Sequence, residues 1–170
     1  MDLGEEKMKR NGGGQLMDRS VASKRPAAKH AFVTPIQIRL SDIDFFGHVH
    51  ATRFMEMVFT ARREEVKARF GKAVAMLEKE HLGWVVAGVE IRYLRQLRLD
   101  DTAEVHTWTI DLRKKECDVG FLVVKNGAKH TAEGVIHFTL VKWPSGWAVA
   151  LPELIRAQYL ADGMFTENEN

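Results

Sequence analysis

The sequence predicts an α+β domain in which a long helix packs against a curved antiparallel sheet of five to six strands. Three observations support this class. One alternating apolar segment comes first, a helical apolar period follows, and four strand-like segments joined by short turns come last. Strands joined by hairpins pair in antiparallel fashion, and such a sheet leaves one face for a helix.

The first strand is predicted at residues 31–40, "AFVTPIQIRL", where apolar and polar residues alternate. Residues 52–70 change to helical spacing, with apolar side chains at steps of three and four residues. These are Phe54, Met57, Val58, Ala61 and Val66. Gly71 is well placed to end this helix, and a shorter helix is predicted at residues 72–80.

Four strands are predicted after Gly83, with turn residues between them. They cover residues 84–94, 102–112, 117–125 and 129–142. Asn126-Gly127 is a hairpin signal, and "WPSGW" predicts a turn before one more short strand. Pro152 is expected to open a last helix, "PELIRAQYLA".

Composition favours one folded domain at residues 31–163, with disordered segments at residues 1–30 and 164–170. Residues 1–30 hold seven Lys/Arg and four Asp/Glu, a net +3, so the rest of the +2 chain sums to −1. The folded part therefore lacks the basic excess of a nucleic-acid binder. The stretches "GEEK" before Met8 and "GGGQL" before Met17 are of a kind that purine-rich, ribosome-binding-like DNA can encode, which motivates the hypothesis that the natural protein begins at Met17.

A single cysteine, Cys117, favours a reducing compartment, because one thiol cannot form an intramolecular disulfide. No apolar run reaches the roughly 20 residues that span a bilayer, and no signal peptide is evident. We therefore expect a cytoplasmic protein without a membrane partner.

The loop between the first strand and the long helix, "SDIDFFGHVHA", contains two aspartates, two histidines and a turn glycine. Backbone N–H groups at a helix start favour negative charge, so they can polarise the oxygen of a carbonyl group. A nearby carboxylate can then act on that carbonyl as a nucleophile or as a general base. The alternative is that the aspartates cap the turn, a role favoured for Asp42 and equally plausible for Asp44. A metal site of Asp44, His48 and His50 is disfavoured, because no metal-ligand spacing recurs elsewhere.

The segment "RLSDIDFFGHVHATRFMEMVFTARRE" resembles the signature of the 4-hydroxybenzoyl-CoA thioesterase family of hot-dog-fold proteins. "VEIRYLRQLRLDDTAEV" and "ALPELIRAQY" are similar to later family segments, so the resemblance extends over residues 32–160. It implies a hot-dog fold and hydrolysis of an acyl-CoA or acyl-carrier-protein thioester. It also implies a homodimer or homotetramer with sites at subunit interfaces, and it implies no cofactor, because coenzyme A is part of the substrate, and no metal.

Residue roles follow from the same resemblance. Asp44 matches the catalytic nucleophile or general base, and Ala51 matches the helix-start amide that stabilises the oxyanion. His48 would line the site or position water, and Arg62 would form a structural ion pair. Substrate-binding positions are Phe46, Gly47, His50, Phe54, Phe59, Arg113, Lys114 and Lys115.

The last three of these positions, Arg113 to Lys115, would contact the phosphates of coenzyme A, with a solvated hairpin turn as the alternative. Several positions depart from the family pattern: His50 and Ala51 replace an Asn-Asn pair, Phe54 a tyrosine, and Phe59 an acidic residue. These departures leave open a non-catalytic module that binds acyl thioesters. A dehydratase fits less well, because its Asp and His stand one residue further apart than Asp44 and His48.

Overall fold

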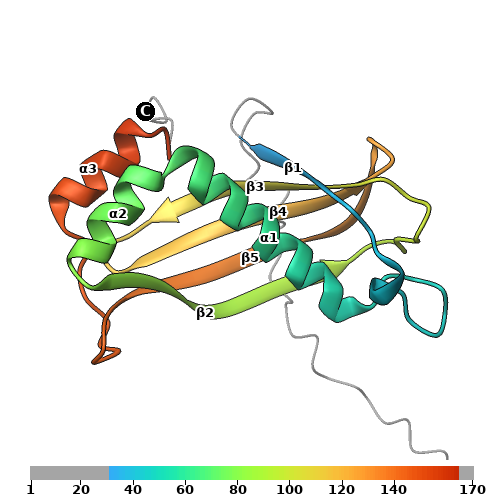
Figure 1. The fold of residues 1–170 in the computed structure, drawn as a ribbon, viewed down its shortest axis with the longest axis horizontal. Helices are drawn as coiled ribbons and strands as arrows, with labels where there is room; N and C mark the ends of the chain where they lie inside the picture. The colour runs from blue at the N-terminus through green and yellow to red at the C-terminus, as the bar shows by residue number, and fades with distance from the viewer. Residues whose placement is uncertain (1–30, 165–170) are drawn as a thin grey trace, which may run out of the picture.

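A computed structural model describes residues 31–164 and contains one five-stranded antiparallel sheet with three α-helices and a short 3-10 helix (Figure 1). The strands are β1 (Phe32–Ile36), β2 (Leu82–Tyr93), β3 (Ala103–Leu112), β4 (Glu116–Lys125) and β5 (Lys129–Lys142). The helices are α1 (Ala51–Arg69), α2 (Gly71–Lys79) and α3 (Glu153–Ala161), and η2 (Leu40–Asp42) is the 3-10 turn. The predictions for residues 1–30, for a start at Met17 and for residues 165–170 lie outside the described residues.

The sheet has the strand order β1-β3-β4-β5-β2, and every neighbouring pair is antiparallel. The hairpin between β4 and β5 turns at Asn126 and Gly127, whose φ angles of 52° and 70° lie in the left-handed region. Register shifts at Val86/Gly88, Thr109/Asp111 and Val123/Val124 mark irregularities that bend and twist a sheet. The predicted α+β class and strand number are confirmed.

Helix α1 crosses one face of the sheet (Figure 1) and buries the apolar stripe that the periodicity predicted. The core between them consists of apolar residues, among them Met57, Val58, Ala61, Val105, Phe121, Val123 and Ile136. Burying one such side chain stabilises the fold by about 1.5–3 kcal/mol. The helix is therefore fixed on the sheet by its apolar stripe.

A buried ion pair within α1 is also linked to β3 by a hydrogen bond from Thr107. Arg62 Nη1 lies 2.6 Å from Glu65 Oε2, and the Thr107 hydroxyl donates to the same oxygen at 2.7 Å. Glu65 is only 1% exposed, so removing one partner would leave a buried charge at a cost of about 3–5 kcal/mol. The structural pairing predicted for Arg62 is confirmed.

Helices α2 and α3 pack together at one end of the sheet, over a second apolar cluster that includes Phe70, Leu140 and Tyr159 (Figure 1). Three details differ from the sequence analysis. Gly71 begins α2 instead of ending α1, because Phe70 already closes the first helix without a left-handed residue. The strand predicted after "WPSGW" is reduced to one bridge between Val141 and Ala148. Met164, predicted as the first residue of a disordered segment, is buried. Among the described residues, no helix combines the length and apolarity that crossing a bilayer requires.

Candidate functional site

The segment between η2 and α1 folds into a tight turn around Asp44. The Asp44 N–H donates to the His48 carbonyl at 2.8 Å, and the Gly47 N–H donates to the Asp44 carbonyl at 3.0 Å. Ile43 and Val49 form a bridge at its base. Gly47 has a φ of +75°, a conformation that strains residues with a Cβ, so this turn favours glycine.

The Asp44 carboxylate is held by one of its two oxygens. Oδ1 accepts the backbone N–H of Phe46 at 2.8 Å and that of His48 at 3.3 Å. Within residues 31–164, Oδ2 has no hydrogen-bond partner, and the side chain is half-buried. The capping alternative is therefore correct for Oδ1, while Oδ2 accepts no hydrogen bond from residues 31–164.

The start of α1 lies directly after this turn. His50 is the N-cap, and its imidazole Nδ1 accepts the Thr52 N–H at 3.2 Å in the role that Asn or Asp usually fills. The Arg53 N–H donates to the His50 carbonyl at 2.9 Å. The Ala51 N–H has no acceptor among the described residues, and Ala51 is exposed. One donor at the positive end of the helix is thus unbonded.

Asp42 differs from Asp44 in that both of its oxygens lie near donors. Oδ2 accepts the Arg39 N–H at 2.8 Å, and Oδ1 lies 3.9 Å from Arg53 Nε. Its backbone carbonyl accepts the His50 N–H at 2.9 Å. The capping role that the sequence analysis favoured for Asp42 is confirmed, and the residue holds the loop against the helix start.

The aromatic residues of the predicted site separate into two kinds. Phe45 and Phe46 are 97% and 76% exposed and stack edge to face on each other, so within one chain they do not shield Asp44 from water. Phe59 is partly exposed on α1. Phe54 is only 3% exposed and packs edge to face on Tyr93. The structure gives Phe54 a packing role, and its contact with substrate stays a prediction.

His48 lies within the turn and is half-buried, and its imidazole forms no hydrogen bond with any residue in the range 31–164. A cleft of about 210 Å³ adjoins this region, and its walls include Asp42, Arg53 and Glu56 but not Asp44. Groups of three His, Cys, Asp or Glu side chains arranged to hold a metal are absent from the described part of the chain.

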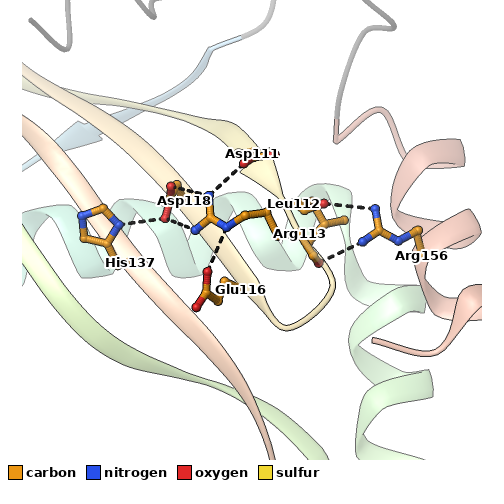
Figure 2. Close-up of polar contacts among 7 residues, drawn as sticks. All are labelled: Asp111, Leu112, Arg113, Glu116, Asp118, His137 and Arg156. Atoms are coloured by element: carbon orange, nitrogen blue, oxygen red, sulfur yellow. Dashed lines mark hydrogen bonds and ion pairs between the residues drawn. The ribbon is translucent and has the colours of Figure 1, made fainter. Parts of the chain in front are cut away.

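Arg113 occupies the centre of an ion cluster in the β3–β4 hairpin (Figure 2). Its guanidinium contacts Asp111 at 2.8 Å, Glu116 at 2.9 Å and Asp118 at 2.9 Å. The hydrogen bond to Asp118 is the main reason that the pKa of Arg113 lies above its ordinary value. Arg113 is therefore already neutralised by carboxylates, whereas Lys114 and Lys115 are exposed.

The cluster extends to neighbouring elements. His137 Nδ1 lies 2.8 Å from Asp118 Oδ1, and the Arg156 guanidinium on α3 donates to the carbonyls of Leu112 and Arg113 at 3.0 and 2.9 Å (Figure 2). Burial alone would raise the pKa of Asp118, but the hydrogen bonds from Arg113 and His137 outweigh it and hold that pKa below its ordinary value. The sequence analysis missed this cluster. The sequence signal for this cluster was the set of acidic residues in and around the turn at residues 113–116, "RKKE".

The other chemically conspicuous residues have structural surroundings. Glu104 lies 3.4 Å from the ring of His106, and Asp118 accounts for His137. Cys117 is buried, and this burial raises the pKa of its thiol to about 11, which disfavours a nucleophilic thiolate. Trp84 donates its indole N–H to the Tyr159 hydroxyl at 3.2 Å.

The chain is similar to known proteins both in sequence and in structure. Residues 38–159 match the model of the thioesterase-like superfamily. A thioesterase from Thermus thermophilus, solved with coenzyme A and Zn, is 28% identical; the match covers 76% of this chain and 92% of that chain, with a TM-score of 0.62.

Two further solved structures share the fold at lower identity. The YbaW probable thioesterase from Escherichia coli is 20% identical, covering 77% of this chain and 97% of that chain at a TM-score of 0.70. The DHNA-CoA thioesterase from Staphylococcus aureus is 15% identical, covering 77% and 87% at a TM-score of 0.68. No curated protein sequence matches. These matches confirm the predicted hot-dog architecture.

Proposed function

The chain belongs to the thioesterase-like superfamily, and from this premise we propose that it hydrolyses an acyl-CoA or acyl-carrier-protein thioester with Asp44 as the catalytic carboxylate. Within the superfamily we propose the 4-hydroxybenzoyl-CoA thioesterase family, on the strength of the loop motif. Coenzyme A as the carrier is supported by the Thermus thermophilus thioesterase, which was solved with coenzyme A. A cytoplasmic location and the absence of a cofactor are part of the same proposal.

One observation carries this proposal. The turn that leads into α1 presents a carboxylate oxygen, Asp44 Oδ2, and a backbone donor, the Ala51 N–H, and neither has a hydrogen-bond partner in residues 31–164. A thioester needs one group to attack or to activate water and another to stabilise the oxyanion. Capping accounts for the Asp42 carboxylate, for Asp44 Oδ1 and for the His50 ring, but not for these two groups.

Two routes fit these groups. In the nucleophilic route, Asp44 Oδ2 bonds to the acyl carbon, the C–S bond breaks, and the thiolate takes a proton. Water then hydrolyses the mixed anhydride and restores the carboxylate. In the general-base route, Asp44 takes a proton from a water that attacks the acyl carbon directly, and the thiolate leaves with that proton. In both routes the Ala51 N–H donates to the developing oxyanion, and His48 is proposed to position the water.

We also propose that the site is completed by a second subunit, in a homodimer or a homotetramer. Strand β2 forms one edge of the sheet over 12 residues, with Val86, Val89 and Tyr93 exposed. A long apolar edge is an association surface unless it is covered. The opposite edge, β1, has only five residues and includes Pro35, which limits further pairing. The exposed Phe45 and Phe46 suit a site that a second subunit encloses.

Thiol release from aromatic, short-chain and long-chain acyl-CoA substrates tests the activity. Asp44→Asn should lower the turnover number on the best substrate by at least about 10²–10³-fold, the loss typical of a group that acts in the transition state. Asp42→Asn is the matched control. Because Asp42 caps the loop, we expect the turnover number of this variant to stay close to that of wild type. Equal turnover in wild-type protein and Asp44→Asn would refute the proposal. Tight acyl-CoA binding without thiol release would favour the non-catalytic module.

The dimer is tested by Val89→Lys, which places a charge on the β2 edge. We expect sedimentation to shift from dimer to monomer and turnover to fall with it, because the site loses its second subunit. The control is Val33→Lys on the β1 edge, which should stay dimeric and active. A Val89→Lys monomer with full turnover would show that the site is complete in one chain.

A further inference from the structure

An apolar cavity of about 320 Å³ lies among α1, α2, α3 and β2, at the end of the sheet opposite the Asp44 turn (Figure 1). Its walls include Val66 of α1, Val74 and Leu77 of α2, Leu82 of β2 and Phe138 of β5. These side chains belong to the second apolar cluster. Protein interiors contain few voids larger than a water molecule, so a cavity of this size beside a hydrophobic cluster is a candidate ligand site.

The wall of this cavity contains a buried donor, the Tyr159 hydroxyl. Tyr159 is 2% exposed, and its oxygen accepts the Trp84 indole N–H at 3.2 Å. Its own proton has no acceptor within residues 31–164. Edge-to-face contact with Phe70 holds the ring in place. Burial raises the pKa of Tyr159 to about 12, so the hydroxyl keeps its proton at neutral pH. A buried donor without an acceptor costs free energy, and an acceptor oxygen on a ligand would remove that cost.

The charged residues of the cavity favour a neutral ligand. Arg62 lines the wall, but its guanidinium is already paired with Glu65 at 2.6 Å. Glu78 is the exposed member of the lining residues, so its carboxylate lies toward solvent at the mouth. Cys117 also lines the wall, and burial disfavours its thiolate. An ion that entered the cavity would lose its hydration without gaining a free partner of opposite charge inside.

The cavity is separate from the Asp44 turn within one chain. At a rise of about 1.5 Å per residue, Ala51 and Val66 are about 22 Å apart along α1. Figure 1 shows the start of α1 at one end of the sheet and α2 and α3 at the other. No residue of the Asp44 turn lines the cavity. A ligand bound there is therefore distinct from a thioester held at the Asp44 turn of the same chain.

We propose that this cavity is a second ligand site, which binds a neutral, mainly apolar molecule with one acceptor oxygen. The ligand oxygen accepts the Tyr159 O–H, and the rest of the molecule contacts the apolar side chains of α1 and α2. A cavity of about 150 Å³ is large enough to bind benzene, so about 320 Å³ accommodates a two-ring ketone. The proposal goes beyond thioester hydrolysis and does not depend on it.

A matched pair of ligands tests the hydrogen bond. Methyl naphthyl ketone contains the acceptor oxygen, and isopropylnaphthalene has a similar shape without it. Calorimetric titration of the full chain should show one site per chain for the ketone. In Tyr159→Phe, which keeps the ring, the ratio of ketone affinity to hydrocarbon affinity should fall about fivefold, since a neutral hydrogen bond contributes a factor of that order. Because each ratio is measured within one protein, a general loss of stability in the variant does not imitate this result.

Filling the cavity tests its location. Val74→Phe adds volume from α2 and should weaken the binding of both ligands at least about tenfold, because the ligand then clashes with the new ring. Val33→Phe, the same change on the exposed surface of β1, is the matched control and should bind like wild type. Circular dichroism checks that each variant folds, and Leu82→Trp fills the cavity from β2 if Val74→Phe does not fold.

Asp44→Asn separates the second ligand site from the proposed thioesterase site. Its affinity for the ketone should stay within about twofold of wild type, because the Asp44 turn does not line the cavity. A large loss of ketone binding in Asp44→Asn would overturn the separation of the two sites. No binding of the ketone by wild-type protein would overturn the proposal, as would an unchanged affinity ratio in Tyr159→Phe or full affinity in the filled variant. Because these experiments measure binding, their outcome does not depend on whether the protein hydrolyses a thioester.

Discussion

The two ends of the sheet both contain basic loops, but the partners of these basic side chains differ. At the β3–β4 hairpin, Arg113 contacts three carboxylates, and Arg156 donates to two backbone carbonyls (Figure 2). At the other end, within the described residues, Arg95, Arg98 and Lys129 have no carboxylate partner at ion-pair distance. The Asp44 turn at that end likewise leaves an oxygen and the Ala51 N–H unbonded.

The difference teaches that a basic run in the sequence does not by itself indicate an anion site. A guanidinium with three carboxylates has little charge left for a ligand, and its hydrogen bonds contribute to stability instead. A cation with only neutral acceptors keeps its charge for a ligand. We therefore assign a stabilising role to Arg113 at the hairpin end and ligand binding to the Asp44 end, and each assignment can be tested by mutation.

The largest expected effect at the hairpin end is on folding. Arg113→Ala would leave the half-buried carboxylate of Asp118 without its main partner, close to Asp111. We expect the free energy of unfolding, measured by urea titration, to fall by about 2–3 kcal/mol. Arg98→Ala, at the other end, should change it by less than about 0.5 kcal/mol. If Arg113→Ala and Arg98→Ala lost equal amounts of unfolding free energy, the two ends of the sheet would not differ in this way.

A smaller effect is expected in the pH dependence of stability. Because the folded pKa of Asp118 lies below its unfolded value, its contribution is full above the unfolded pKa, about 3.9, and is lost as the pH falls through the folded pKa. In Asp118→Asn, the free energy of unfolding should therefore fall less than in wild type as the pH drops below about 5, by roughly 1 kcal/mol. Unfolding free energies measured between neutral and acid pH check this. An unchanged acid slope in Asp118→Asn would contradict the assignment.

The elements were predictable because local patterns determine them. The apolar period of α1, the strand-like segments of β3 to β5 and the Asn126-Gly127 turn each depend on neighbours in the sequence. The turn around Asp44 was predictable for the same reason, since its bonds join residues at most four positions apart. Local sequence therefore predicts both the fold class and the position of the candidate carboxylate.

The partners of charged groups were harder to predict, because they depend on strand register. Asp111, Asp118 and His137 come together only because the register shift at Thr109/Asp111 sets Asp111 opposite Asp118, which in turn faces His137. A one-residue change in register would place these side chains on the opposite face. Arg95 and Lys129 likewise line one depression although they are far apart in sequence. Phe54 was assigned to substrate because the motif gives residue types and no burial.

The most direct test of the account is to measure turnover and coenzyme A binding on the same preparation of Asp44→Asn. The carboxylate is proposed to act on the thioester and not on the carrier. We therefore predict a turnover number at least about 10²-fold below wild type and a dissociation constant for coenzyme A within about twofold of wild type. Turnover close to wild type in a variant that still binds coenzyme A would contradict the catalytic role of Asp44.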